Sequence, residues 1–361
     1  MMKVGVNLFP LERDKWSGIE IYTYELIKFL NRANLDLETY SLSKIPANPE
    51  IEKTNYKSLN NAEAGSLTKL FYNLYGITKQ VVNPDVFHST SFSLPYFLKA
   101  KKKVITIHDF AFYKHPELFD YKTKLYYKLI LEHSIKAADR IICISKSCLA
   151  DFEEYFPQPS LREKTRLVYN GFSDFSKIEV PLKANSYQDY LFCVGASHSR
   201  KNIERTLKAY SILAQKYDQL KIVMTGSIDP TLISEFVNGN QTLENKVFHL
   251  NYVSQDDLIN LYRHAKVLMF PSLYEGFGFP ILEAMSCGVP VLTSYSSSCG
   301  EIAGYDSKFL VDPYNVEDIV AKTELILQPE NYKMLVENGK QRVAHFSWEK
   351  MGSETLDVYR D

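Results

Sequence analysis

Short apolar runs, each the length of one buried strand, recur along this chain and most constrain how it can fold. The runs are Lys3–Asn7, Val104–Asp109, Arg140–Ser145, Leu191–Gly195, Lys221–Gly226, Lys266–Ser272 and Val289–Ser294. Helical periodicity fills the spaces between them, beginning at Ile19 and again over Glu204–Tyr217. Strands that alternate with helices form parallel sheets covered by helices. Two such series predict an α/β protein with two Rossmann-like, doubly wound parallel-sheet domains.

The domain boundary is predicted from length and local composition. A chain of 361 residues exceeds the size of one hydrophobic core. Residues 175–190 are polar and irregular and lie between two strand runs. We therefore expect one domain over residues 1–180 and a second over residues 187–345. The last segment, residues 346–361, has a helical pattern that Ser347 could cap, and we expect it to pack back on the first domain.

Composition excludes several classes of protein. Lys+Arg 42 and Asp+Glu 43 nearly balance, which argues against bulk nucleic-acid binding. The five cysteines are odd in number and show no C-x-x-C spacing, so neither a disulfide framework nor a structural zinc site is indicated. The first residues lack the pattern of a signal peptide, and no apolar stretch approaches the ~18 residues that span a bilayer. These features predict a cytoplasmic protein.

The segment Tyr274–Pro290 carries the strongest chemical signal. Gly276 and Gly278 lack side chains, so their backbone N–H groups can approach a ligand closely. The helix that follows would point its N-terminus at the ligand edge of the sheet, where an anion such as a diphosphate is favoured. Glu275 lies before this helix and Glu283 one turn inside it, so the two carboxylates would reach different parts of one ligand. The competing interpretation is a plain loop that leads into a core helix.

The residues around this segment resemble a known family. The order Glu275-Gly-Phe-Gly-Phe-Pro-Ile-Leu-Glu283, followed by Gly288-Val-Pro-Val, resembles the retaining glycosyltransferases of the family-4 type, also called glycosyl transferases group 1. The resemblance extends from the glycine loop near Gly18 to the closing FSWEK helix. It implies a GT-B fold, with two Rossmann-like domains that face a cleft. It also implies an acceptor-side first domain and a second domain that binds a nucleotide sugar.

The resemblance assigns roles to residues of the Glu275–Glu283 segment. Glu283 corresponds to the glutamate that accepts hydrogen bonds from the ribose hydroxyls, a role that suits a carboxylate with two acceptor oxygens. Glu275 corresponds to the glutamate that binds hydroxyls of the transferred sugar. The backbone of Gly276, Phe277 and Gly278 is expected to line the sugar and the diphosphate.

The segment Ser197–Asn202 resembles the phosphate-binding segment of that family. It maps the family's lysine to Lys201, where a cation would neutralise the leaving diphosphate as its charge develops. Many members carry an arginine at the position of Ala196, so Arg200 is the candidate for the second phosphate contact. The alternative is that Arg200 and Lys201 form a solvated turn before a helix.

Candidates in the first half come from the same resemblance. Gly18 matches a glycine of the loop that approaches the donor phosphates, although Ser17 replaces the usual first glycine. His108 matches a histidine that meets the donor sugar at the cleft floor, and Asp109 would hold the loop or the histidine. His88 is a weaker acceptor-side candidate. The alternatives are a plain turn for Gly18 and a structural role for His108.

The resemblance also implies a reaction and a donor. The family transfers with retention and without a protein nucleophile, since the leaving phosphate oxygen takes the acceptor proton on the same face. The co-substrate implied by the resemblance is a nucleotide-diphosphate sugar, and neither a further cofactor nor a metal is expected. Consistent with the absence of a metal, the sequence holds no D-x-D segment of the kind used by metal-dependent glycosyltransferases. The base is expected beside the backbone near Val253. The patterns HDFAFY and SRKN resemble mannosyltransferases for surface polysaccharides, which favours mannose and a GDP-linked donor.

The acceptor is expected to be a saccharide or a lipid-linked saccharide. Lysines and tyrosines interleave over Leu98–Val104 and Phe112–Ile130. Such a pattern is typical of a surface that contacts an anionic membrane. The alternative is one strand flank followed by an ordinary amphipathic helix.

Other functions remain as alternatives. A nicotinamide-dependent dehydrogenase would need G-x-G-x-x-G after the first strand, and this sequence does not supply it. The unequal placement of Glu275 and Glu283 argues against a glycoside hydrolase acid pair. Another GT-B sugar enzyme, such as an epimerase or a phosphorylase, and a non-catalytic nucleotide-sugar-binding protein stay open. Donor turnover with a sugar acceptor would separate these.

Overall fold

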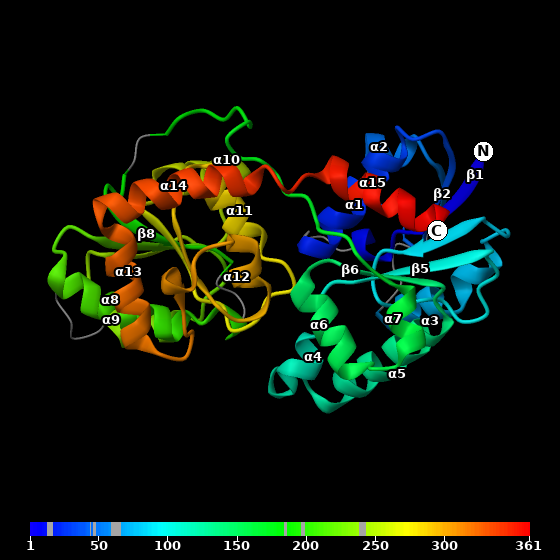
Figure 1. The fold of residues 1–361 in the computed structure, drawn as a ribbon, viewed down its shortest axis with the longest axis horizontal. Helices are drawn as coiled ribbons and strands as arrows, with labels where there is room; N and C mark the ends of the chain where they lie inside the picture. Colours follow the sequence, from blue (N-terminus) through cyan, green and yellow to red (C-terminus); the bar gives the residue numbers. More distant parts are fainter. Residues whose placement is uncertain are drawn as a thin grey trace. The chain divides into compact units, whose positions relative to one another are not determined.

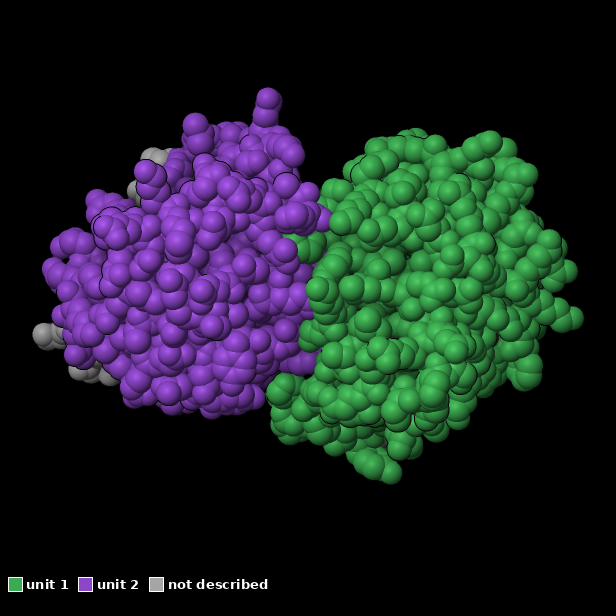
Figure 2. All heavy atoms as spheres, viewed as in Figure 1, with its two compact units in different colours: residues 1–171, 346–361 green, residues 172–345 purple. Residues whose placement is uncertain are grey.

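The chain forms two compact units in a computed structural model. The structure describes residues 1–12, 17–43, 45, 48–58, 66–183, 186–195, 199–237 and 243–361. Unit 1 comprises Met1–Gly171 and Phe346–Asp361, and unit 2 comprises Phe172–His345. Figure 2 shows the two units in green and purple.

Unit 1 is built on a parallel sheet. Among the described residues it has seven strands in the order β3-β2-β1-β4-β5-β6-β7. They are β1 (Met2–Asn7), β2 (Leu35–Ser41), β3 (Asn55–Ser58), β4 (Val86–Ser89), β5 (Lys102–Ile107), β6 (Arg140–Cys143) and β7 (Thr165–Leu167). The central strands are buried on both faces, since helices cover a parallel sheet on both sides. The order reverses at β1, where β2 and β4 pair with its two edges.

Helices of unit 1 pack on both faces of this sheet (Figure 1). They are α1 (Gly18–Leu30), α2 (Pro49–Glu52), α3 (Ser66–Leu74), α4 (Ala111–Lys114), α5 (Tyr121–Ala137), α6 (Lys146–Tyr155), α7 (Pro159–Lys164) and α15 (Trp348–Arg360). Two apolar clusters form the core, one with α1 and α15 and the other with α5 and α6.

The last helix of the chain belongs to unit 1. Ser347 caps α15, since its hydroxyl accepts a hydrogen bond from the Lys350 backbone N–H at 3.1 Å. The helix packs closely against α1: a Cβ at Gly352 would lie 2.2 Å from the Phe29 ring. Only glycine permits this approach, so a larger residue at position 352 would force the two helices apart.

Unit 2 repeats the architecture with a parallel sheet of six strands in its described residues, in the order β10-β9-β8-β11-β12-β13. The strands are β8 (Tyr190–Cys193), β9 (Lys221–Met224), β10 (Val247–His249), β11 (Val267–Phe270), β12 (Val291–Ser294) and β13 (Leu310–Val311). The helices are α8 (Ile203–Lys216), α9 (Pro230–Val237), α10 (Gln255–His264), α11 (Phe279–Ser286), α12 (Ser297–Ala303), α13 (Val316–Leu327) and α14 (Pro329–Val343).

The predicted α/β class with parallel, doubly wound sheets is confirmed. Each strand run identified in the sequence is a strand of the structure, although most end one or two residues earlier than predicted. The strand runs identified in the sequence do not include β2, β3, β4, β7, β10 or β13. Several of these lie at or near sheet edges. An edge strand is less buried than a central one, so its sequence needs fewer apolar residues and gives a weaker signal. No helix in the described ranges is both long and apolar enough to cross a membrane.

Candidate functional site

The loop from β11 to α11 lies at the carboxyl edge of the unit 2 sheet, where parallel sheets bind ligands. Gly278 begins α11 with a φ of +101°, a conformation that side chains other than glycine rarely adopt. Pro280 occupies the first turn, as predicted. The Phe277 ring is buried, so this residue offers its backbone rather than its side chain to a ligand. Helix α11 therefore starts four residues after Glu275, with Gly278 as its cap.

Lys201 and Glu275 form an ion pair at this edge. Lys201 Nζ lies 2.7 Å from Glu275 Oε1, and the two side chains are only 13% and 9% exposed. The amine also lies 4.4 Å from the centroid of the Phe270 ring, the last residue of β11. The pair joins residues 74 positions apart, because β8 and β11 are neighbours in the sheet.

Electrostatics around Glu275 favour its ionised form. Burial alone would raise the pKa of this carboxyl, but the charges of Lys201 and Arg200 outweigh it and hold the pKa below its usual value. Glu275 is therefore a buried carboxylate near neutral pH, and Lys201 is its closest cation. Before any ligand binds, these two opposite charges neutralise each other.

Asn202 fixes the turn that carries Lys201. Its backbone has a φ of 61°, and it precedes α8. Its amide Nδ2 donates to the carbonyl of Pro271 at 3.0 Å and to that of Pro313 at 2.6 Å. Arg200 is partly exposed, and its carbonyl accepts a hydrogen bond from Leu273 N at 2.8 Å. The neighbouring Ala196, where the family arginine is absent, lies outside the described residues, as does Ser197.

The first two serines of α12 hold the loop of Glu275. Ser297 Oγ accepts a hydrogen bond from the Glu275 backbone N–H at 3.0 Å. Ser298 Oγ, which is fully buried, lies 2.9 Å from the carbonyl of Glu275 and 2.8 Å from that of Phe277 and donates to them. These bonds fix the backbone on both sides of Gly276.

Glu283 has a different environment. Its Oε2 accepts a hydrogen bond at 2.8 Å from the phenol of Tyr262, which is fully buried in α10. Burial raises the pKa of Glu283 to about 7, although the Tyr262 hydrogen bond and the charge of Lys201 act in the opposite direction. The two glutamates thus differ: Glu275 is held ionised by a cation, and Glu283 sits near its midpoint of ionisation at neutral pH.

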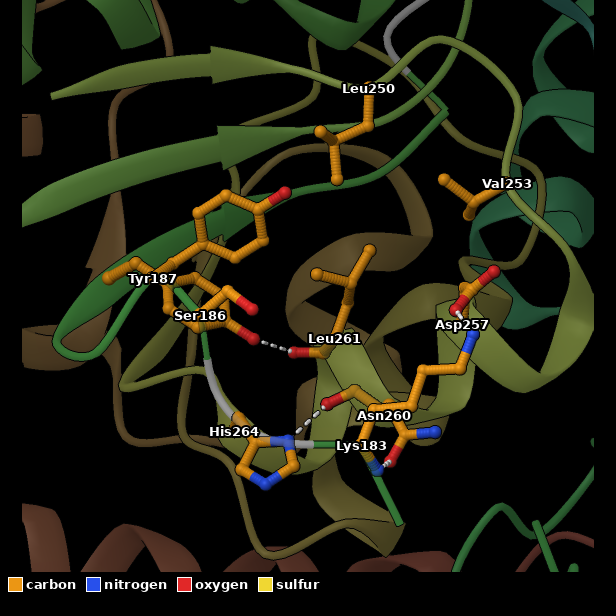
Figure 3. A pocket seen from close by; sticks show the side chains of 10 residues that line it. Lys183, Ser186, Tyr187, Leu250, Val253, Asp257, Asn260, Leu261 and His264 are labelled. Atoms are coloured by element: carbon orange, nitrogen blue, oxygen red, sulfur yellow. Dashed lines mark hydrogen bonds and ion pairs between the residues drawn. The ribbon is translucent and has the colours of Figure 1, made fainter. Parts of the chain in front are cut away.

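Val253 lines a pocket of about 370 Å³ in unit 2 (Figure 3). Leu250 and Val253 follow β10 and form one end of this pocket. Tyr190, the first residue of β8, and His264, the last residue of α10, contribute to the remainder. The Val253 end therefore lies at the carboxyl edge of the sheet, and the rest of the pocket is lined by residues of α10 and of the segment that leads into β8.

The candidates of unit 1 lie at the carboxyl edge of its own sheet. His108 follows β5, and its Nε2 donates to the carbonyl of Thr90 at 2.8 Å, since a carbonyl can only accept. Nδ1 of the neutral ring then carries the lone pair. Burial lowers the pKa of His108, so the ring is neutral near pH 7. The Tyr22 ring of α1 lies edge-on to it, with centroids 5.0 Å apart.

Gly18 is the first residue of α1, and Ser17 precedes it as the cap. Ser17 N and Oγ both donate to Glu20 Oε2, at 2.8 and 2.6 Å. The serine that replaces the family glycine thus serves to start the helix. Residues 13–16, which precede it in the same loop, lie outside the described residues.

The structure gives His88 and Asp109 structural contacts. Both ring nitrogens of His88 are bonded, Nδ1 to Tyr359 Oη at 2.7 Å and Nε2 to Thr106 Oγ1 at 2.8 Å. The ring is fully buried, so an acceptor-side role for His88 is wrong. Asp109 Oδ1 accepts from the Ala111 N–H at 3.0 Å and so holds the loop after His108.

Comparisons with known proteins identify the family. A family profile described as "Glycosyltransferase Family 4" matches residues 16–174, and one described as "Glycosyl transferases group 1" matches residues 174–342. The chain belongs to this glycosyltransferase family. The sequence-based prediction of the family and of a glycosyltransferase is therefore confirmed.

Two O-antigen mannosyltransferases align with most of this glycosyltransferase. It is 29% identical to O-antigen chain mannosyltransferase B of Escherichia coli, over 98% of this chain and 99% of the relative. It is 27% identical to O-antigen chain mannosyltransferase RfbU of Salmonella typhimurium, over 80% of this chain and 81% of the relative. Its fold is similar to that of sucrose-phosphate synthase from Thermosynechococcus elongatus, with a TM-score of 0.73, 20% identity and coverage of 100% and 98% of the two chains. The GT-B fold is thereby confirmed.

Sequence reasoning missed the residues that hold this glycosyltransferase's site in shape. Tyr262 lies 21 positions from Glu283, and Ser298 lies 23 positions from Glu275. No local pattern links such distant residues, because their contacts arise only when α10 and α12 pack beside α11. Asn202 stands directly before α8, where asparagine is a typical cap, but its side chain makes no cap hydrogen bond and binds the carbonyls of two prolines instead. Within the described residues, no group of three or more His, Cys, Asp or Glu side chains could hold a metal ion.

Proposed function

We propose that this glycosyltransferase transfers a hexose, with mannose favoured, from a nucleotide-diphosphate sugar to a saccharide acceptor with retention of configuration. The observation that carries this proposal is the buried Lys201–Glu275 pair at the carboxyl edge of the unit 2 sheet, beside the N-terminus of α11. Mannose, a GDP-linked donor and a place in surface polysaccharide or lipopolysaccharide biosynthesis are supported by the near full-length similarity to O-antigen chain mannosyltransferase B.

Each candidate residue of unit 2 then contacts one part of the donor. Glu275 accepts hydrogen bonds from hydroxyls of the hexose, and Glu283 accepts them from the ribose. Lys201 and the backbone of Gly276–Gly278 contact the diphosphate, and the base lies beside Val253. Arg200 is proposed as a second cation for the diphosphate, because its charge already acts on Glu275. In unit 1, Gly18 allows the start of α1 to approach the phosphates.

The chemistry follows from charge and position. The bond between the anomeric carbon and the phosphate oxygen breaks, and negative charge develops on the leaving diphosphate. Lys201 stabilises that charge, and the leaving oxygen accepts the proton of the acceptor hydroxyl on the same face as the new bond forms. His108, neutral with a free lone pair on Nδ1, accepts a hydrogen bond from the hexose rather than providing a positive charge. Lys201 pairs with Glu275 in the free protein. When the donor binds, Lys201 contacts the diphosphate and Glu275 contacts the hexose, and these contacts replace the ion pair.

A turnover assay tests the activity itself. Release of the nucleoside diphosphate should depend on both a nucleotide sugar and a saccharide acceptor. An epimerase would change the donor without an acceptor, and a phosphorylase would require inorganic phosphate. A non-catalytic binding protein would retain donor affinity without turnover under any of these conditions.

Thermal unfolding with a panel of donors should identify the nucleotide. We expect GDP-mannose to raise the Tm more than UDP-, ADP- or CDP-sugars. A ligand at 100 times its Kd stabilises the native state by ~2.7 kcal/mol, which corresponds to roughly 5 °C or more for a domain of this size. The Lys201→Met variant should lose most of this shift. A panel in which no nucleotide sugar raises the Tm would refute donor binding as proposed.

We also propose that unit 1 contacts an anionic membrane surface through α5. Tyr121, Leu125 and Leu129 are 75%, 44% and 56% exposed, and Lys128 is exposed beside them. Their spacing places them on one face of the helix. The other predicted stretch, Leu98–Val104, gives less support. Its Lys101 pairs with Asp85 at 2.7 Å, and its Lys102 donates to the Tyr359 carbonyl, as expected of a strand flank.

Vesicle binding tests the membrane contact. The protein should co-sediment with vesicles that contain phosphatidylglycerol, more weakly at high salt, and hardly at all with pure phosphatidylcholine. A Leu125→Gln/Leu129→Gln variant should bind severalfold less. Leu182→Gln is the matched control, because Leu182 is an 80% exposed leucine of unit 2. If the wild type shows no binding to anionic vesicles even at low salt, the contact does not exist.

A further inference from the structure

We infer that Tyr262 is a positioning residue for donor binding, because its phenol holds the Glu283 carboxylate in one orientation and leaves the second carboxylate oxygen for the ribose. This inference rests on the proposed ribose-binding role of Glu283. Tyr262 Oη donates to Glu283 Oε2 at 2.8 Å. Across the described residues, this phenol is the only hydrogen-bond donor that reaches the side chain of Glu283. Oε1 therefore remains available as an acceptor.

The phenol can orient the carboxylate because the tyrosine ring is buried and packed against other rings. Tyr262 has 0% of its surface exposed. The Phe192 ring of β8 lies edge-on to it at 5.1 Å and 85°, and the Phe175 ring lies at 5.5 Å and 61°. A tyrosine fixed from two sides by aromatic rings places its hydroxyl at one point in space. The hydrogen bond then transmits this rigidity from α10 to Glu283 on α11.

Orientation matters for a ligand with two neighbouring hydroxyls. A glutamate side chain rotates about three bonds, and holding it in one arrangement costs conformational entropy on binding. If Tyr262 holds the carboxylate before the donor arrives, the Glu283 side chain has lost this entropy on folding, and donor binding no longer includes the loss. Loss of the phenol should therefore weaken donor binding and leave the chemical step nearly unchanged, since Tyr262 touches neither the hexose nor the leaving oxygen in the proposed arrangement.

The same bond affects the ionisation of Glu283. A donor to the ionised form stabilises the carboxylate, so removal of the phenol should raise the pKa of Glu283 further above about 7. Two groups besides burial act on this ionisation: the Tyr262 phenol on α10 and the Lys201 amine before α8. The Cys287 thiol at the end of α11 does not, because its pKa is raised to about 11 and it stays neutral in this range. Only the phenol changes in a tyrosine-to-phenylalanine variant. If the phenol had a purely structural role, its removal would not change the pH midpoint of donor binding.

The experiment compares Tyr262→Phe with Tyr210→Phe in the full-length enzyme. Tyr210 is a matched control: it is a fully buried tyrosine of unit 2 whose hydroxyl donates to the Leu220 carbonyl at 2.9 Å and which does not contact Glu283. Tyr262→Phe should raise the KM for the donor about tenfold, equivalent to ~1.4 kcal/mol, with kcat changed less than about threefold. It should also shift the pH midpoint of donor kcat/KM upward by roughly half a unit or more. Tyr210→Phe should lower the Tm without either effect.

Glu283→Gln separates this inference from the function on which it rests. If Glu283→Gln leaves the donor KM unchanged, the proposed role of Glu283 fails. If Glu283→Gln raises the KM while Tyr262→Phe behaves like Tyr210→Phe, the positioning role of Tyr262 is overturned. In the Glu283→Gln background, Tyr262→Phe should add no pH shift, since no carboxylate remains to titrate. Should Tyr262→Phe not fold, Phe175→Leu keeps both bonded groups but frees the ring, and an unchanged donor KM in that variant overturns the inference.

Discussion

Replacement of Lys201 by methionine is expected to slow sugar transfer by about two to three orders of magnitude and to destabilise unit 2. Loss of a cation that stabilises charge on the leaving group lowers the rate by roughly 10²–10³-fold, or ~3–4 kcal/mol. The substitution also leaves Glu275 buried without its closest counter-charge, and removal of one partner of a buried pair costs about 3–5 kcal/mol. Steady-state kinetics and chemical denaturation measure the two effects separately.

The double variant Lys201→Met/Glu275→Gln distinguishes the electrostatic cost from the catalytic one. With both charges removed, stability should return to within about 1 kcal/mol of the wild type, whereas activity should stay at least as low as in Lys201→Met. The exposed pair of Lys208 and Glu204 on α8 provides the control, since Lys208→Met/Glu204→Gln should change stability by less than about 0.5 kcal/mol. Activity of Lys201→Met within tenfold of wild type would contradict the assignment.

The pH dependence of the pair has a definite sign. The pKa of Glu275 is lower in the folded protein than in the unfolded chain, so its ionisation stabilises the fold above the unfolded pKa. That stabilisation should be lost as the pH falls through the folded pKa, in the acid range. The Glu275→Gln variant should lose this acid-sensitive part of the stability curve.

Donor affinity is expected to increase about tenfold between pH 6 and pH 8 because Glu283 ionises in this range. Burial raises its pKa to about 7, and the ionised carboxylate is the better acceptor for two ribose hydroxyls. His108 does not contribute a transition here, since burial lowers its pKa below the usual value. Calorimetric titration with the preferred donor at several pH values measures the change.

Glu283→Gln supplies the comparison for this pH effect. The amide is similar in size and does not titrate, so donor affinity should be weaker and nearly constant from pH 6 to pH 8. Stability should respond in the opposite direction to affinity. Because the folded pKa of Glu283 lies above its usual 4.5, the free protein should lose stability as the pH rises from about 4.5 to 7, and Glu283→Gln should lack this loss. A steep pH profile that persists in Glu283→Gln would place the titrating group elsewhere.

Much of the fold could be predicted because its signals are local. The run Val104–Asp109 is mostly apolar up to Ile107, as a strand buried on both faces requires, and β5 ends at Ile107. Ser347 as the cap of the last helix and Pro280 in the first turn of α11 also follow from short-range chemistry. The interpretation of His88 was wrong because its two hydrogen-bond partners, Thr106 and Tyr359, lie on other elements.

By itself, the sequence determined the α/β class, the chemical nature of the Glu275–Glu283 segment and, through resemblance, the family. These depend on residues close in the chain, where periodicity and turn chemistry act directly. Only the tertiary structure decided that Lys201 neutralises Glu275, that Tyr262 holds Glu283 and that Ser298 fixes the loop between them. The physical reason is that parallel strands bring together segments separated by tens of residues. Charged and hydroxyl groups that come together only at the sheet edge create no periodic pattern in the sequence.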